Sequence, residues 1–203
     1  GLNTGGMGAY TPVPSISSYK MSELSKTFVE PIVQYLAEQS IYYQGMFYAG
    51  LIVTDKGPNL LEINVRFGDP ETQAIIPLLE TDLLELLHAS ARGTLNEIEK
   101  IKWNNDYAMT VVMAATGYPE DYNKLTSINN LENLSLTKDE YLFHAGTTLK
   151  EHKWLSNGGR VLNISSTGKD LKTIRQNIHK VINQINWYEG YYRKDIGWRY
   201  IDE

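Results

Sequence analysis

A β-hairpin is the first element that the pattern of polar and apolar residues predicts. Between residues 59 and 67 the two kinds of side chain alternate, which is typical of a strand with one polar and one apolar face. Glu62, Asn64 and Arg66 share the polar face. Residues 45–53 form a second apolar segment, and the turn-forming sequence TDKGP between the two segments predicts that they pair as antiparallel strands.

Helical periodicity and further strands follow along the chain. Apolar residues at helical spacing after Ser22 predict a helix, which Pro31 should kink or divide into two. Pro70 is expected to open a short helix through about Leu79, and Thr81 to cap another that ends near residue 93. Later segments predict three strands and a strongly amphipathic helix, over residues 107–119, 141–147, 159–168 and 169–185. Antiparallel strands beside helices predict an α+β fold.

The length and a change of composition predict two domains. The chain has 203 residues, which is enough for one or two domains with a core of their own. A polar connector lies near residues 95–105, between the leucine-rich helix and the next apolar strand. We therefore expect one domain over residues 1–97 and another over residues 98–203.

Charge and cysteine content exclude several classes of function. The net charge of −5 argues against a general nucleic-acid-binding surface. The chain has no cysteine, which excludes disulfides, zinc–thiolate sites and a cysteine nucleophile. No apolar run approaches the roughly 18–20 residues of a membrane-spanning helix, so we expect no membrane partner and a cytoplasmic location.

The polar face of the hairpin has the composition of a cation site. Residues two apart on a strand lie roughly 6.5–7 Å apart on the same face. The oxygens of Glu62 and Asn64 could therefore converge on one hard cation, which prefers oxygen ligands and often bridges to phosphates. Arg66, one step further, is suited to a carboxylate or phosphoryl group. A strand with one solvated face would show the same alternation, so both interpretations stay open here.

Three other motifs carry possible chemistry. The glycine-rich sequence NTGGMGAY at residues 3–10 can expose backbone N–H groups to an anion, or it can serve as a flexible linker. The sequences HAGT (144–147) and NGGRV (157–161) are interpreted as ordinary turns at strand ends. The sequence YYRKDIGWR (191–199) places three cations beside aromatic residues, which favours a phosphate pocket over a disordered basic tail.

Taken together, these motifs resemble the phosphoribosylamine–glycine ligase family, also called glycinamide ribonucleotide synthetase, within the ATP-grasp superfamily. The matching stretches are NTGGMGAY, LEINVRFGDPETQ, VVMAATGYP, FHAGT, NGGRVL and YYRKDIGWR, in the family's order and over nearly the whole chain. The resemblance implies a ligase of de novo purine biosynthesis. In that reaction ATP phosphorylates the carboxylate of glycine. The amine of 5-phosphoribosylamine then attacks the glycyl phosphate, which yields glycinamide ribonucleotide, ADP and phosphate.

The resemblance also implies roles for individual residues. It makes Glu62 and Asn64 ligands of magnesium (Mg2+) or manganese (Mn2+) at the ATP phosphates, and gives Arg66 the task of stabilising the acyl phosphate. Asp69 joins Arg66 as a candidate catalytic residue. The candidate substrate-binding residues are Thr4, Gly5, Gly6, Met7, Gly68, Asp69, Pro70, Arg193 and Lys194, of which the last two are assigned to the ribose 5-phosphate.

Against the family pattern, the N-terminal domain and the small ATP-grasp lobe, with most of the adenine pocket, are missing from this sequence. We therefore expect the chain to be the rear part of an ATP-grasp domain followed by a small α/β C-terminal domain, with the missing N-terminal part as its partner. Two alternatives remain: a folded binding or interaction fragment without activity, and another ATP-grasp carboxylate–amine ligase.

Overall fold

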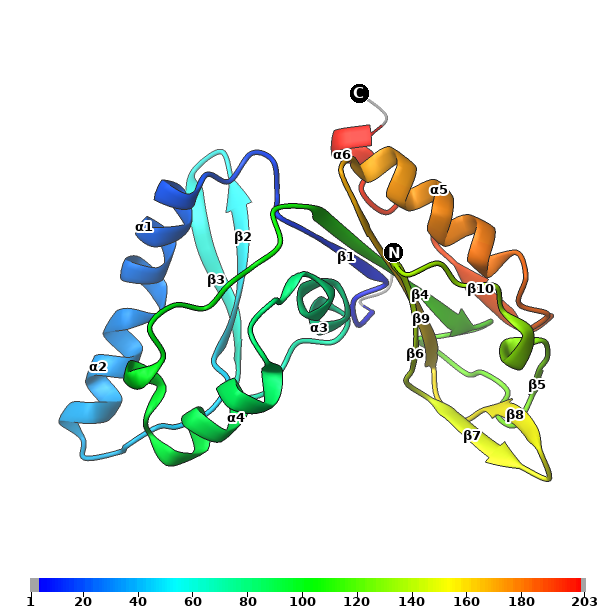
Figure 1. Cartoon of the computed structure of the whole chain (residues 1–203), viewed down its shortest axis with the longest axis horizontal. Coiled ribbons are helices and arrows are strands. Elements are labelled where there is room, and N and C mark those ends of the chain that lie inside the picture. Colours follow the sequence, from blue (N-terminus) through cyan, green and yellow to red (C-terminus); the bar gives the residue numbers. More distant parts are fainter. Residues whose placement is uncertain (1–3, 202–203) are drawn as a thin grey trace. The chain divides into compact units, whose positions relative to one another are not determined.

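The computed structural model describes residues 4–201, and its contacts divide the chain into two compact units. The first unit comprises residues 4–12, 69–78 and 104–201, and the second comprises Val13–Gly68 and Leu79–Trp103. Figure 1 shows the elements of both units. These units are interleaved in the sequence, whereas the predicted domains are continuous, so the boundary between residues 97 and 98 stays a prediction. No helix within the described residues has the length and apolar character needed to cross a bilayer.

Antiparallel sheets form the framework of the first unit. The larger sheet has five strands in the order β1-β4-β9-β6, with β10 also paired to β4. Its strands are β1 (Gly8–Thr11), β4 (Tyr107–Ala115), β6 (Glu140–His144), β9 (Arg160–Gly168) and β10 (Gly190–Tyr192). A three-stranded sheet follows the order β5-β8-β7, formed by Ser127–Ile128, Lys153–Ser156 and Thr147–Lys150. The three strands predicted in this region are confirmed, and the structure shows that they pair in antiparallel fashion.

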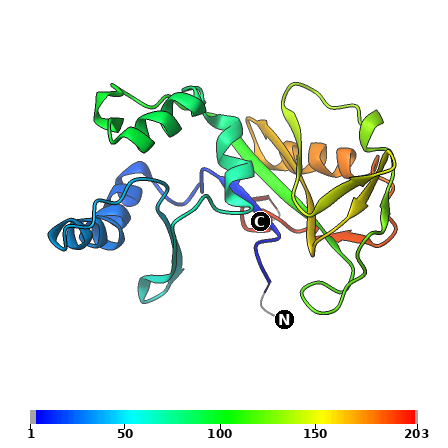
Figure 2. The same cartoon turned by 90° about the horizontal axis from the view of Figure 1, so that it is seen from below.

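Helix α5 (Leu171–Ile182) supplies the main core of the first unit and confirms the predicted amphipathic helix. Its buried stripe consists of Leu171, Ile174, Ile178, Val181 and Ile182. Figures 1 and 2 show α5 running along one face of the large sheet, where it packs against β4 and β9. The Asp170 side chain caps the helix by accepting a hydrogen bond from the backbone N–H of Thr173 at 2.8 Å, and this bond lowers the pKa of Asp170.

A short helical segment holds the Asp69-Pro70 turn beside the same sheet. It consists of α3 (Glu71–Ile75) followed by the 3₁₀ turn η1 (Ile76–Leu78), so the predicted helix over this region is confirmed in two pieces. Ala74 and Leu78 are buried, and α3 contacts β1, β4 and β9. The turn that precedes α3 is therefore fixed to the sheet through the packing of the helix.

The helices of the second unit differ from the prediction mainly at their first residues. They are α1 (Ser18–Phe28), α2 (Glu30–Glu38), α4 (Leu83–Arg92) and the 3₁₀ turn η2 (Leu95–Glu97). The first begins at Ser18, because the hydroxyl of Ser17 caps it instead of the expected cap Ser22. The predicted break at Pro31 is confirmed, since that proline lies in the first turn of α2. The predicted cap Thr81 is wrong: the Asp82 carboxylate accepts from the N–H of Glu85 instead.

The hairpin of the second unit pairs β2 (Tyr48–Thr54) with β3 (Gly57–Asn64) in antiparallel fashion, as predicted. The predicted strand over residues 59–67 is too long, because β3 ends at Asn64 and the chain bends at residues 65 and 66. The apolar side chains of this segment stay largely in solvent: Leu61 and Val65 are 66% and 69% exposed. The alternation therefore predicts the two faces of β3 correctly but not the residue at which the strand ends.

The two turns with the sequences HAGT and NGGRV contact each other backbone to backbone in the first unit. The N–H of Gly146 donates to the carbonyl of Arg160 at 3.1 Å, and the N–H of Asn157 donates to the carbonyl of Gly146 at 2.6 Å. A β-carbon on Gly146 would lie 2.6 Å from the Arg160 oxygen and 2.8 Å from the Cα of Gly158. The HAGT and NGGRV sequences thus share a contact that admits no side chain.

The substitution Gly146→Ala should therefore lower the stability of the chain by about 1–3 kcal/mol, because its methyl group must push two backbone segments apart. Thermal unfolding followed by circular dichroism measures this loss. Gly168→Ala is the matched control, since its β-carbon would meet the Ile174 side chain at 3.3 Å and no backbone. Equal unfolding midpoints for Gly146→Ala and the parent would show that the two turns are not packed as described.

Candidate functional site

Glu62 and Asn64 lie on one face of β3, as the strand pattern predicts. Glu62 stands opposite Gly50 and Asn64 opposite Tyr48, beside a shift of register between Gly50 and Leu51. A β-carbon on Gly50 would lie 2.9 Å from the Cγ of Glu62, so the glycine leaves the space that the glutamate side chain crosses. Within the described residues, neither Glu62 nor Asn64 makes a hydrogen bond or ion pair through its side chain.

The chemistry of these two side chains fits a hard divalent cation. One carboxylate and one amide oxygen are the ligands that magnesium or manganese accepts, and such ions are commonly bound by one or two carboxylates together with phosphates and water. Among residues 4–201 there is no group of three or more His, Asp or Glu side chains arranged to hold a metal. Glu62 and Asn64 would therefore supply only part of a coordination sphere, and the phosphates of a nucleotide are suited to supply the rest.

Arg66 does not continue the row on the strand. It lies in the bend after β3, and its Nη1 donates to the carbonyl of the neighbouring Phe67 at 2.9 Å. The side chain is exposed. Gly68, another candidate residue, ends the same continuous segment of the second unit. The structure thus keeps Glu62, Asn64, Arg66 and Gly68 in one unit.

The glycine-rich segment Thr4–Met7 packs closely against other parts of the first unit. The N–H of Gly5 donates to the phenolic oxygen of Tyr118 at 3.1 Å. A β-carbon on Gly5 would lie 3.1 Å from the Cζ of Arg160, and one on Gly6 would lie 2.4 Å from the Cδ of Pro70. These glycines therefore make room for neighbouring side chains, which a flexible linker does not require. The substrate-binding role expected for Thr4–Met7 stays a prediction.

Arg160 connects this segment to the Asp69-Pro70 turn. Its Nη1 donates to the carbonyl of Gly6 at 3.1 Å and to the carbonyl of Asp69 at 2.6 Å. Its Nη2 lies 3.4 Å from Oδ2 of Asp69, while Oδ1 accepts a hydrogen bond from the Nε2 of Gln73 at 3.2 Å. Asp69 is thus held from two sides.

The sequence did not single out Arg160, because NGGRV was interpreted as a plain turn. The one available signal was a cation placed directly after two glycines at the start of an apolar strand. The structure explains the second of these glycines as well, since a β-carbon on Gly159 would lie 2.2 Å from the Tyr118 ring. Arg160, Tyr118, Gly5, Gly6 and the Asp69-Pro70 turn therefore form one cluster within the first unit.

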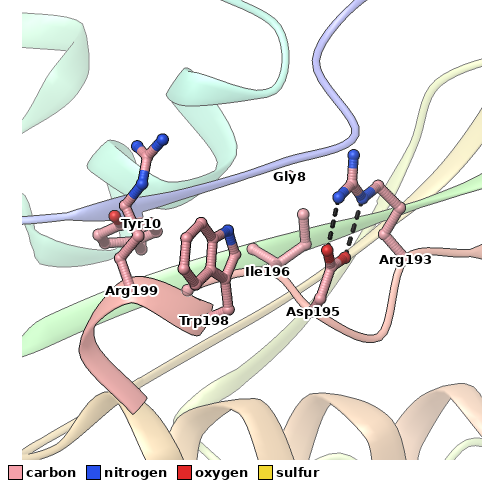
Figure 3. Close-up of a pocket in the computed structure, with 8 residues that line it drawn as sticks. Gly8, Tyr10, Arg193, Asp195, Ile196, Trp198 and Arg199 are labelled. Atoms are coloured by element: carbon pink, nitrogen blue, oxygen red, sulfur yellow. Dashed lines mark hydrogen bonds and ion pairs between the residues drawn. The ribbon is translucent and has the colours of Figure 1, made fainter. Parts of the chain in front are cut away.

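A pocket of about 220 Å³ lies at the C-terminal segment (Figure 3). It is lined by Gly8, Tyr10, Arg193, Asp195, Ile196, Gly197, Trp198 and Arg199. The Arg193 guanidinium pairs with the Asp195 carboxylate through two contacts, Nε to Oδ1 at 2.9 Å and Nη2 to Oδ2 at 2.5 Å. These hydrogen bonds lower the pKa of Asp195 and raise the pKa of Arg193. The Arg193 side chain is thereby oriented, and its Nη1 is not used in this pair.

The second cation of this pocket differs from the predicted one. Lys194, which the resemblance paired with Arg193, is exposed and does not line the pocket. Arg199 does, with its Cζ 5.3 Å from the centre of the Trp198 ring. Arginine on an aromatic face is a weakly hydrated cation with a planar donor fork, which suits a phosphate group. Arg193 and Arg199 are therefore the two cations among the residues that line this pocket.

Two family models match the chain. The model of the phosphoribosylglycinamide synthetase ATP-grasp (A) domain matches residues 1–72, and that of the phosphoribosylglycinamide synthetase C domain matches residues 108–199. The phosphoribosylamine–glycine ligase of Rhizobium meliloti is 45% identical over 199 residues, which are 98% of this chain and 46% of that protein. That of Synechocystis is 45% identical over 97% of this chain and 47% of its own length. The chain spans about half the length of the curated relatives it matches.

Solved structures confirm the predicted α+β fold of ATP-grasp type. The phosphoribosylamine–glycine ligase of Thermotoga maritima superposes with a TM-score of 0.77 and 32% identity, over 96% of this chain and 47% of that one. The biotin carboxylase domain of the Hydrogenobacter thermophilus 2-oxoglutarate carboxylase gives a TM-score of 0.66 at 11% identity, over 94% of this chain and 41% of that one. The second likeness concerns the fold alone.

Proposed function

We propose that this chain, which belongs to the phosphoribosylglycinamide synthetase family, supplies the metal- and substrate-side part of an ATP-dependent ligase of de novo purine biosynthesis. The ligase transfers the γ-phosphoryl group of ATP to the carboxylate of glycine. The amine of 5-phosphoribosylamine then forms the amide bond and displaces phosphate, which leaves glycinamide ribonucleotide and ADP. The observation that carries the proposal is the match to phosphoribosylamine–glycine ligases along 98% of the chain.

In this proposal Glu62 and Asn64 hold magnesium or manganese, because they offer two oxygens on one face and have no competing partner within the described residues. A bound divalent cation supplies positive charge that offsets the charge of the phosphates during phosphoryl transfer. Arg66 stabilises the charge of the acyl phosphate through the donors that its contact with Phe67 leaves available. The fit of these residue types supports a nucleotide-bound cation rather than a site built from protein ligands alone.

Substrate binding is assigned to two places, whose residues belong to the first unit except for Gly68, which ends a segment of the second unit. The Gly68-Asp69-Pro70 turn and the Thr4–Met7 segment hold the glycine or ribosyl substrate. Asp69 has a catalytic role as a carboxylate fixed beside these backbone groups. The pocket beside Arg193 and Arg199 binds the 5-phosphate of phosphoribosylamine. A phosphate remote from the reacting amine provides binding energy that orients the reacting end.

The remaining length of the ligase is the proposed partner of this chain. The hairpin exposes Leu61, Ile63 and Val65, a row of aliphatic side chains that is costly to leave in water. Packing against the rest of the enzyme would bury this row. A cytoplasmic location is likewise proposed here; the Arabidopsis thaliana relative is named as chloroplastic.

Activity of this chain by itself is a separate question. Because the chain spans about half the length of its relatives, it is expected to fold but to form no glycinamide ribonucleotide when supplied with ATP, magnesium, glycine and phosphoribosylamine. A hybrid in which this chain replaces the matching segment of the Rhizobium meliloti ligase should be active, because the hybrid restores the full length of the enzyme. Product formation and ADP release are measured for both proteins under the same conditions.

Two results would contradict this assignment. Robust glycine-dependent ADP release by this chain alone would show that the nucleotide site lies within it. A folded hybrid that accepts a different amine or carboxylic acid in place of phosphoribosylamine or glycine would identify another ATP-grasp carboxylate–amine ligase. Omission of each substrate in turn distinguishes the two cases.

A further inference from the structure

The Arg160 side chain joins two backbone segments that are far apart in the sequence. Its acceptors are the carbonyl of Gly6, 154 positions away, and the carbonyl of Asp69, 91 positions away. The side chain of Arg160 is 21% exposed, so its charge is partly removed from water. Hydrogen bonds from an ionised donor are about twice as strong as those between neutral groups. Arg160 is therefore a strong link between these two segments.

The segments that Arg160 joins fit against each other without spare room. A β-carbon on Gly5 would lie 3.1 Å from the guanidinium carbon of Arg160, and one on Gly6 would lie 2.4 Å from the Pro70 ring. The N–H of Gly5 is held by Tyr118, whose own carbonyl accepts a hydrogen bond from the hydroxyl of Tyr191 at 3.0 Å. These contacts restrict the glycine-rich segment and leave no space for a side chain at Gly6.

Arg160 itself stands on a rigid base. It is the first residue of β9, the strand between β4 and β6, and pairs with Ala114 of β4. Its carbonyl accepts a hydrogen bond from the N–H of Gly146. The next residues of β9, Val161 and Leu162, are fully buried. The guanidinium is thus placed by the core of the first unit.

We infer that Arg160 is a positioning residue that fixes the Thr4–Met7 segment against the Asp69-Pro70 turn, so that both present one arrangement to the substrate. Its catalytic consequence rests on the function proposed above. Arg160 acts through Gly6 and Asp69, because two carbonyls and one carboxylate already engage its Nη atoms. A misplacement of about 1 Å in groups that orient a substrate costs on the order of 100-fold in rate.

Hydrogen exchange of the chain itself tests the structural half of this inference. In Arg160→Met the apolar stem remains while the three contacts disappear. The amide of Gly5 should then exchange at least about tenfold faster, because loss of charge-assisted bonds frees the segment. Amides of α5 should keep their protection. Arg92→Met, a change at the exposed end of α4, is the control and should leave Gly5 unchanged.

Steady-state kinetics of the hybrid ligase test the catalytic half. At a temperature where all variants are folded, Arg160→Met should lower kcat about 100-fold and change the KM for ATP by less than about twofold. Arg160→Lys keeps the positive charge and can still donate a hydrogen bond to one carbonyl. Its kcat should therefore be about tenfold higher than that of Arg160→Met. A role in stability alone would leave kcat at that temperature unchanged.

The outcomes separate this inference from the proposed function. Unchanged exchange at Gly5 in both Arg160→Met and Arg160→Lys would overturn the positioning role, even if the hybrid proves inactive. A large rise in the KM for phosphoribosylamine with unchanged Gly5 exchange would also overturn it, because Arg160 would then bind substrate directly. If the Gly5 amide exchanges faster in Arg160→Met but the parent hybrid is inactive, the positioning role of Arg160 is supported and the proposed function is contradicted. If Arg160→Met fails to fold, Arg160→Lys decides between these results.

Discussion

Glu62→Gln in the hybrid ligase is expected to lower kcat by at least about 100-fold while moving the thermal midpoint by no more than about 2 °C. Glutamine keeps the shape of the side chain and removes the charge that attracts a divalent cation. Glu62 is exposed and has no partner within the described residues, so the fold does not depend on its charge. Turnover and unfolding are measured on the same preparation, over a range of magnesium concentrations.

Asp55→Asn provides the matched control for this change. Asp55 lies in the turn of the same hairpin, is exposed, and loses the same charge. Its substitution should leave turnover within about twofold of the parent. Equal turnover of Glu62→Gln and the parent at saturating magnesium would remove Glu62 from the cation site.

Arg193→Ala should raise the KM for phosphoribosylamine roughly 10- to 150-fold, which corresponds to a loss of about 1.5–3 kcal/mol in one charge-assisted contact. The KM values for ATP and glycine should change little, because Arg193 contacts the 5-phosphate of phosphoribosylamine. Initial rates with each substrate varied in turn measure the effect. Lys172→Ala, an exposed position on α5, is the control for the loss of a positive charge.

Two neighbouring variants decide which cation assists Arg193. The pocket geometry predicts that Arg199→Ala resembles Arg193→Ala and that Lys194→Ala has a smaller effect. The reverse order would restore the pair Arg193 and Lys194 that the sequence resemblance implied. If Arg193→Ala raised the KM for ATP and left the KM for phosphoribosylamine unchanged, the segment would belong to the nucleotide-binding side of the enzyme.

Periodic features of this chain could be predicted from the sequence because they depend on neighbours along the chain. The apolar stripe of α5 follows from a period of 3.6 residues, and the shared face of Glu62 and Asn64 follows from a period of two. The residues at which helices and strands begin and end could be predicted less reliably. The alternation continues past Asn64, where the strand ends, and the cap at Ser17 depends on a local hydrogen bond that a neighbouring serine was equally able to make.

The cluster around Arg160 was beyond sequence reasoning for a different reason. Its partners Gly6 and Asp69 come from distant parts of the chain, and a cation that binds carbonyls leaves no periodic pattern. The sequence shows where the glycines are but not why a glycine is needed there. Gly5, Gly6 and Gly159 accommodate neighbouring side chains that only the fold brings close to them. Similarly, Arg199 enters the pocket because the chain turns at Gly197, which adopts a φ of +81°.

The fate of the carboxylate oxygens of glycine tests the central claim most directly. The hybrid ligase is supplied with ATP, magnesium, phosphoribosylamine and glycine labelled with oxygen-18 in both carboxylate positions, and the released phosphate is analysed by mass spectrometry. Ligation through glycyl phosphate predicts one labelled oxygen in each phosphate and one in the amide of the product. Unlabelled phosphate released together with the amide product would contradict a glycyl phosphate, and with it the function proposed for this chain.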